Sequence, residues 1–123
     1  MPAEKKIILI VDDSPIIIER LKIMLEDLEN VRTILHAGSY LETLDLLAEN
    51  SPDLAILDIH LPGKNGIELL RYIKNNRPEI IVIMLSNQAD DFYRDLCRIH
   101  GARYFIDKSR ESELIPGIIS SIR

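Results

Sequence analysis

Short apolar runs rich in β-branched residues alternate along this chain with longer segments whose apolar positions recur at helical spacing. Three of the short runs are apolar almost throughout, as expected of strands in a parallel sheet that is covered on both faces. The alternation predicts five strands, each followed by a helix. The predicted strands are residues 6–11, 32–36, 54–57, 80–85 and 103–106.

Each predicted helix has one apolar face. Ser14 can cap the first helix and Pro15 suits its first turn, whereas Pro116 and Gly117 lie near the start of the last helix and disfavour a helix interior. The expected core faces are Ile17, Leu21, Met24, Leu25 and Leu28; Leu41, Leu44, Leu47 and Ala48; Ile67, Leu70 and Ile73; Phe92, Leu96 and Ile99; and Leu114, Ile115, Ile118, Ile119 and Ile122.

Five successive strand–helix units predict a three-layer, doubly wound α/β domain. Crossovers between parallel strands are right-handed, so we expect helices on both faces of the sheet and a functional crevice at the carboxyl ends of the strands. The expected strand order is 2-1-3-4-5, the common order of flavodoxin-like (βα)5 domains. A length of 123 residues without a linker or low-complexity tract suits one unit, so residues 1–123 are expected to form a single domain with no separate output domain.

Composition narrows the range of partners. The formal charge of −5 argues against nucleic acid or an anionic membrane as the direct partner. The apolar runs are far shorter than the roughly 20 residues that a membrane span needs, which predicts no membrane insertion. A single cysteine, Cys97, forms no disulfide within the chain and suits a reducing compartment, so the expected location is cytoplasmic.

Chemically active side chains follow four of the predicted strands. Asp12 and Asp13 come after the first strand, Asp58 after the third, Ser86 after the fourth and Lys108 after the fifth. An Asp-Asp pair alone is a common helix start, but the predicted order gathers all five residues at one edge of the sheet. Clustered carboxylates favour a hard cation such as Mg²⁺, and a lysine with a hydroxyl beside it suits a phosphoryl group.

Four segments, residues 5–14, 57–66, 84–86 and 101–108, resemble the receiver domain of response regulators in two-component signalling. The stretch that contains Asp58, Leu61, Pro62 and Gly66 is the most specific part of the resemblance, which runs along the whole chain. The chain is similar to single-domain regulators of the chemotaxis type.

The resemblance implies a phosphoacceptor switch in a phosphorelay. Asp58 would take a phosphoryl group from a histidine kinase or a histidine phosphotransfer protein. Asp13, Asp58 and the backbone carbonyl of His60 would hold Mg²⁺, with Asp12 reaching the ion directly or through water. The chain would not be an enzyme in the usual sense, because it would assist only its own phosphorylation and dephosphorylation.

The resemblance also implies how the signal leaves the site. Lys108 would pair with the phosphoryl oxygens, and Ser86 would hydrogen-bond one of them after transfer and draw its loop inward. Phe105 would then turn inward and change the surrounding face for a downstream protein target. Tyr104 is the alternative aromatic residue for this switch.

Four positions near these residues bear on the resemblance. Ser109 replaces the proline that usually follows the lysine, often after a cis bond, so the isomer of the Lys108–Ser109 bond stays open. Asn87 stands where the family often has a small residue and could crowd the phosphoryl group. His60 and Gln88 occupy the two positions that tune phosphate lifetime in the family.

Residues of the first and fourth helices suggest two surfaces that could contact partner proteins. Ile16 and Ile23 lie away from the predicted core face of the first helix, and we hypothesise that this flank docks the phosphodonor. Tyr93 and Cys97 are expected on the outer side of the fourth helix. Cys97 has no neighbour in sequence that would lower its pKa and is interpreted as an inert thiol.

Three other functions compete with this interpretation. The first is a receiver-like interaction module that works without phosphorylation. The second is an aspartate-nucleophile phosphatase or dehalogenase, although such enzymes carry Asp-x-Asp whereas Asp12 and Asp13 are adjacent. The third is flavin or dinucleotide binding, which is weakened because the loop after the first strand contains no glycine.

Overall fold

The computed structural model describes residues 5–87 and 91–122, so Gln88 lies outside the described residues. Five parallel strands form one sheet with the order β2-β1-β3-β4-β5, which confirms the predicted topology. The strands are β1 (Lys6–Val11), β2 (Val31–Ala37), β3 (Leu54–Asp58), β4 (Ile81–Ser86) and β5 (Tyr104–Asp107). The helices are α1 (Pro15–Leu25), α2 (Tyr40–Glu49), α3 (Gly66–Asn76), α4 (Asp91–Ile99), the 3-10 turn η1 (Ser112–Leu114) and α5 (Ile115–Ser121).

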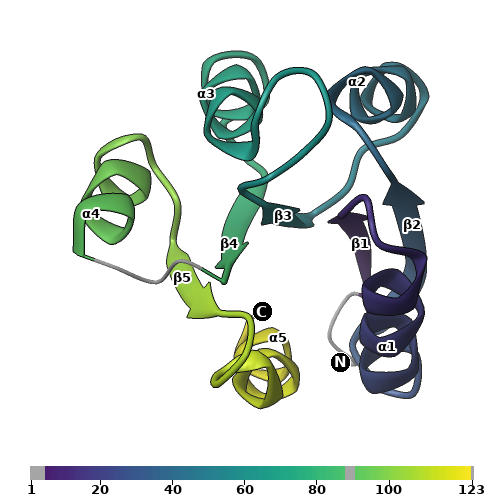
Figure 1. Cartoon of the computed structure of the whole chain (residues 1–123). Helices are drawn as coiled ribbons and strands as arrows, with labels where there is room; N and C mark the ends of the chain where they lie inside the picture. The colour runs from purple at the N-terminus through teal and green to yellow at the C-terminus, as the bar shows by residue number, and fades with distance from the viewer. Residues whose placement is uncertain (1–4, 88–90, 123) are drawn as a thin grey trace.

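Helices cover both faces of the sheet, with α1 and α5 on one side and α2, α3 and α4 on the other (Figure 1). Side chains that alternate along β1 explain this division. Leu9 and Val11 join the buried cluster under α2, α3 and α4, whereas Ile8 and Ile10 join the cluster under α1 and α5. The three central strands β1, β3 and β4 are buried on both faces over most of their length, as their continuous apolar sequences predict, whereas the edge strand β2 has exposed residues.

Side-chain caps begin three of the helices. Ser14 Oγ accepts a hydrogen bond from the backbone N–H of Ile17, at 3.4 Å, and Pro15 occupies the first turn of α1. Ser39 caps α2 and Asn65 caps α3 in the same way. Pro116 lies in the first turn of α5, where its missing N–H removes no helical hydrogen bond.

The predicted core face of α2 is wrong in part. Leu41 is 71% exposed and Ala48 is also exposed, whereas Thr43 is fully buried beside the correctly predicted Leu47. The buried Thr43 hydroxyl donates a hydrogen bond to the carbonyl oxygen of Ser39, at 2.8 Å, so this polar side chain is buried without an unpaired group.

The predicted outer side of α4 is also wrong. Cys97 is fully buried and Tyr93 packs against the core, while Phe92 and Ile99 are 68% and 70% exposed. The small thiol of Cys97 belongs to the same buried cluster as Val82 and Met84 of β4. Burial raises the pKa of Cys97 to about 11, so the thiol is protonated at neutral pH, consistent with the interpretation of an inert residue.

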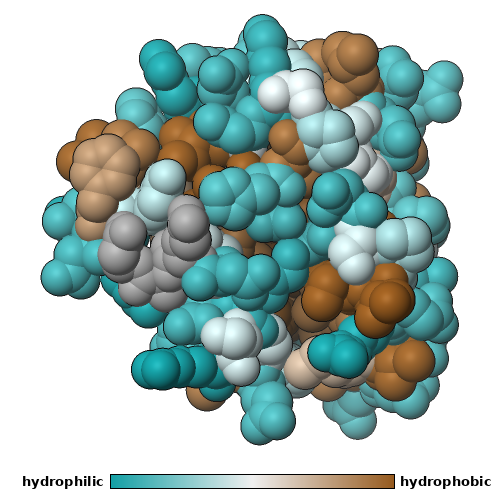
Figure 2. Space-filling view, in the orientation of Figure 1, coloured by the Kyte–Doolittle hydropathy of each residue, from teal (hydrophilic) through white to brown (hydrophobic). Residues whose placement is uncertain are grey.

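Large apolar side chains are also exposed on α1, where Ile16 and Ile23 are 70% and 61% accessible. Figure 2 shows hydrophobic residues at the surface over α1 and over α4. None of the helices within residues 5–87 and 91–122 is long and apolar enough to cross a membrane.

Candidate functional site

The end of β1 places a buried carboxylate beside an exposed one. Asp12 directly follows the strand and continues its pairing, because its backbone N–H donates to the carbonyl oxygen of Ala37 at 3.1 Å. The Asp12 side chain is buried, and its Oδ1 accepts a hydrogen bond from the backbone N–H of Ser14 at 2.9 Å. Asp13 is exposed, and one of its carboxylate oxygens lies within 4.8 Å of an oxygen of Asp12.

Asp58 is the last residue of β3, not the first residue after it, and it is 5% exposed. Its Oδ1 accepts a hydrogen bond from the backbone N–H of His60 at 3.2 Å. The chain then folds back so closely that the N–H of Gly66 donates to the carbonyl oxygen of Ile59 at 2.7 Å. A Cβ atom at Gly66 would lie 2.0 Å from the Asp58 carbonyl oxygen, so this approach requires glycine.

Lys108 follows β5 and brings a positive charge to both buried aspartates. Its Nζ lies 2.6 Å from Asp12 Oδ2 and 3.1 Å from Asp58 Oδ2. The Lys108 backbone N–H donates to the carbonyl oxygen of Ser86 at 2.9 Å, which fixes the residue beside the end of β4. The Lys108–Ser109 bond, whose isomer the sequence leaves open, is trans.

Burial and nearby charges shift the pKa values of Asp58 and Lys108. Burial raises the pKa of Asp58 above its usual value, because it outweighs the opposing attraction of Lys108, and the charge of Asp12 adds to the rise. Burial alone would lower the pKa of Lys108, but its hydrogen bond to Asp12 and the charges of Asp58 and Asp12 reverse that effect and raise it. The ammonium group is therefore charged at neutral pH.

The three aspartates can hold a cation. Asp12, Asp13 and Asp58 each offer a carboxylate oxygen within 4.8 Å of the others. Asp12 Oδ2 is buried, and among the described residues it contacts the Lys108 ammonium, at 2.6 Å. An all-oxygen donor set with an open, exposed side fits Mg²⁺ better than a metal that prefers nitrogen or sulfur ligands. A ligand role for the His60 carbonyl stays a prediction.

Ser86 reaches the same edge of the sheet. It is the last residue of β4, is fully buried, and pairs in register with Asp107 of β5. The following Asn87 is exposed. The structure thus gathers the five strand-end residues that the sequence singled out, although the role of each in chemistry remains a prediction.

The two candidate switch aromatics lie on opposite faces of the sheet. Phe105 packs against the cluster under α2, α3 and α4, and Tyr104 against the cluster under α1 and α5. The Arg94 guanidinium lies 5.0 Å from the Phe105 ring centroid, donates to the Phe105 carbonyl oxygen at 3.3 Å and pairs with Glu111 at 3.2 Å. Sequence reasoning missed Arg94 and Glu111, because their contacts join distant segments.

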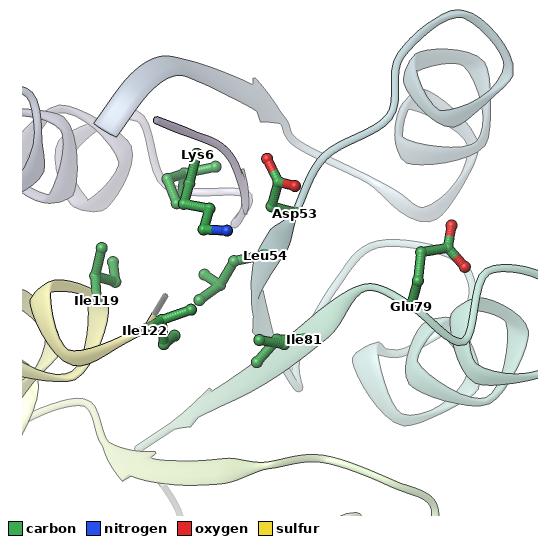
Figure 3. Close-up of a pocket in the computed structure, with 8 residues that line it drawn as sticks. Lys6, Asp53, Leu54, Glu79, Ile81, Ile119 and Ile122 are labelled. Carbon is green, nitrogen blue, oxygen red and sulfur yellow. The ribbon is translucent and has the colours of Figure 1, made fainter. Parts of the chain in front are cut away.

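A second cavity lies at the other end of the sheet, where Lys6, Leu54 and Ile81 begin their strands (Figure 3). It has a volume of about 190 Å³ and combines apolar side chains with the charged groups of Lys6, Asp53 and Glu79. Because the aspartates lie at the carboxyl ends of β1 and β3, this cavity is separate from their site.

Known proteins are similar to this chain in both sequence and fold. The chain is 31% identical over 102 residues to the DNA-binding transcriptional activator EvgA of Escherichia coli, covering 81% of this chain and 48% of that protein. It is 33% identical over 118 residues to the transcriptional regulatory protein MalR of Bacillus subtilis, covering 94% and 49%. The chain therefore spans about half the length of these curated relatives.

A solved structure agrees with this similarity. The CheY-like response regulator receiver domain protein of Methanospirillum hungatei is 30% identical and superimposes with a TM-score of 0.84, over 94% of this chain and 91% of that one. Residues 8–119 match the family described as the response regulator receiver domain. The chain belongs to the family of response regulator receiver domains, the signalling domains of two-component systems.

Proposed function

We propose that this chain is a phosphoacceptor switch in which Asp58 receives a phosphoryl group from a phosphohistidine on a histidine kinase or a histidine phosphotransfer protein. The observation that carries the proposal is the meeting of three carboxylates and the Lys108 ammonium in one pocket at the carboxyl edge of the sheet. Membership of the receiver family supports the phosphodonor as the partner.

The transfer is a substitution at phosphorus. A carboxylate oxygen of Asp58 forms a new bond to phosphorus, and the bond from phosphorus to the donor's imidazole nitrogen breaks with its electron pair left on that nitrogen. Mg²⁺ held by Asp12, Asp13, Asp58 and the carbonyl of His60 would supply positive charge to the phosphoryl oxygens. Positioning and electrostatics account for the chain's own contribution, so it acts as a self-modifying switch and not as a general enzyme.

Lys108 would contact the phosphoryl oxygens from the side opposite to Mg²⁺. Its ammonium already lies 3.1 Å from Asp58 Oδ2, so it is placed to pair with oxygens bound to phosphorus at that position. The Ser86 hydroxyl would donate to one of these oxygens after transfer. Movement of the Ser86 loop would then reach Phe105, which we favour over Tyr104 because it packs on the side of α4.

Two surfaces would meet partners. Ile16 and Ile23 line a shallow hollow with Pro15, Glu19 and Arg20 on α1, and we assign this flank to the phosphodonor. The face around Phe105 and α4 would meet a downstream protein target. We propose that the described domain contacts protein and not nucleic acid directly, because its net charge is −5.

The test is phosphorylation by a small-molecule donor. Incubation with acetyl phosphate and Mg²⁺ should add one phosphoryl group to the wild type, seen by mass spectrometry and removed by hydroxylamine, as expected of an acyl phosphate. Asp58→Asn should gain none, whereas Asp45→Asn, which changes an exposed carboxylate on α2, should behave as the wild type. Absence of the adduct, with no spectral response to beryllofluoride, would favour a phosphorylation-independent interaction module instead.

A further inference from the structure

The residues on either side of Lys108 are joined to each other by hydrogen bonds. Asp107 Oδ1 accepts a hydrogen bond from the backbone N–H of Ser109 at 3.0 Å and another from its hydroxyl at 2.8 Å. A carboxylate that bonds to the chain two residues later is a local turn that holds the intervening residue in place. Lys108 is that intervening residue.

Further hydrogen bonds hold the backbone of this loop. The Ser112 hydroxyl donates to the Lys108 carbonyl oxygen at 2.6 Å, while the Lys108 N–H donates to Ser86. Glu111 closes the loop around Asp107, because Glu111 Oε1 accepts from the Asp107 N–H at 2.9 Å and the Glu111 N–H donates to the Asp107 carbonyl oxygen at 2.8 Å. Both backbone polar groups of Lys108 are therefore paired.

Such pairing matters because the Lys108 side chain is long and flexible. Four methylene carbons separate its Cα from the ammonium group, so ordering the lysine side chain costs conformational entropy. The ammonium must nevertheless lie within contact of both Asp12 and Asp58, at 2.6 and 3.1 Å. A fixed Cα position narrows the set of side-chain conformations that reach this point.

Ser109 holds this turn through its backbone as well as its side chain. Its N–H supplies one of the two donors to Asp107, and its hydroxyl supplies the other. Ser109 itself is exposed, so its hydroxyl is not needed to fill the core. Hydrogen bonds from Ser109 also lower the pKa of Asp107, so Asp107 is ionised and accepts both bonds at neutral pH.

We propose that Asp107 and Ser109, supported by Ser112, are positioning residues that hold Lys108 for phosphoryl transfer to Asp58. This inference rests on the proposed function, since it assigns the residues that place the lysine within that site. The reaction itself is unchanged: the bond to Asp58 forms and the bond to the donor's leaving group breaks.

The test compares four variants by the rate of adduct formation across a range of acetyl phosphate concentrations. Asp107→Ala removes the acceptor and should lower the maximal rate about tenfold, a loss typical of a misplaced catalytic group, with the half-saturating concentration changed much less. Asp107→Asn keeps an oxygen at the acceptor position and should restore most of the rate. Ser109→Ala keeps the N–H donor and should fall between the two.

Ser121→Ala is the control for Ser109→Ala, because it also removes an exposed serine hydroxyl that donates a hydrogen bond, in this case to the backbone carbonyl of Ile118 in α5. It should leave the rate unchanged. The inference is overturned if Asp107→Ala loses thermal stability but keeps the wild-type maximal rate where it is folded, or if Asp107→Asn is as slow as Asp107→Ala. Failure of the wild type to form any adduct removes the proposed function together with this inference, so the two failures are distinguishable.

Discussion

Replacing Lys108 by methionine tests the charge balance of the site. The side chain of Lys108 is 10% exposed and pairs with Asp12 and Asp58, whose side chains are 1% and 6% exposed. Methionine keeps most of the volume of lysine but removes the charge, so two buried carboxylates lose their common partner. We expect Lys108→Met to lower the free energy of unfolding strongly at neutral pH.

The distances set the scale of this loss. At an effective dielectric constant of about 20, the Coulomb attraction is about 6 kcal/mol at the 2.6 Å separation and about 5 kcal/mol at 3.1 Å. Desolvation of the three groups offsets most of that attraction, and removal of one partner of a buried pair typically costs about 3–5 kcal/mol. We therefore expect a loss of about 3 kcal/mol, which is a large part of the roughly 5–15 kcal/mol that stabilises a domain.

Urea denaturation in metal-free buffer measures this loss. For a loss of about 3 kcal/mol the midpoint should fall by about 1–3 M. The deficit should shrink in acid, because Lys108 holds the pKa of Asp58 down against burial and protonation of Asp58 removes an unpaired charge. Lys64→Met, which removes an ammonium from the ring of Tyr40, should cost about 1 kcal/mol or less. A Lys108→Met deficit no larger than this control, or one that is equal in acid and at neutral pH, would refute the reasoning.

Three further substitutions follow from the same geometry. Because the pKa of Asp58 is raised, protonated Asp58 stabilises the fold below its usual pKa of about 3.9, and this stabilisation is lost as the pH rises through the folded-state pKa. Asp58→Asn should therefore raise the urea midpoint at neutral pH and lose this advantage in acid. A lower midpoint at neutral pH would contradict this. Asp13→Ala relieves repulsion among carboxylates within 4.8 Å, so it should raise the melting temperature without metal and abolish the stabilisation by Mg²⁺; an unchanged response to Mg²⁺ would exclude Asp13 from the metal site. Ile23→Asp should slow phosphotransfer from a histidine kinase but not from acetyl phosphate, with Ile99→Asp on α4 as the control; equal slowing with both donors would argue against docking at α1.

The strand-end cluster could be predicted because its geometry follows from topology. Apolar runs identify the strands, right-handed crossovers restrict the topology, the common flavodoxin-like order places β1 beside β3, and parallel neighbours end at the same edge. Asp12 and Asp58 meet because β1 and β3 are adjacent in the sheet, with Val11 opposite Leu57 in the register. Periodicity together with this common strand order places these residues.

Helix orientation was less predictable, because hydropathy does not record how a helix meets the sheet. On α4, the spacing of Phe92 and Ile99 predicts a core face, yet the smaller Cys97 occupies the buried position. On α2, Thr43 counts as polar in any hydropathy pattern, but its hydrogen bond to Ser39 allows burial.

The contacts around Lys108 could not be predicted at all. Asp107, Ser109 and Glu111 are polar residues in a connecting loop, where no period marks which side chain meets which backbone group. The contact of Arg94 with Phe105 and Glu111 depends on the approach of α4 to β5, which sequence spacing does not specify.

Gly66 lies so close to the end of β3 that the position of Asp58 depends on this uncharged residue. A single methyl group there would meet the Asp58 carbonyl carbon at 2.8 Å and its oxygen at 2.0 Å, so the backbone that carries the proposed phosphoacceptor would have to move. A substitution of Gly66 would therefore displace Asp58, although Gly66 carries no charge and has no side chain that could hold an ion.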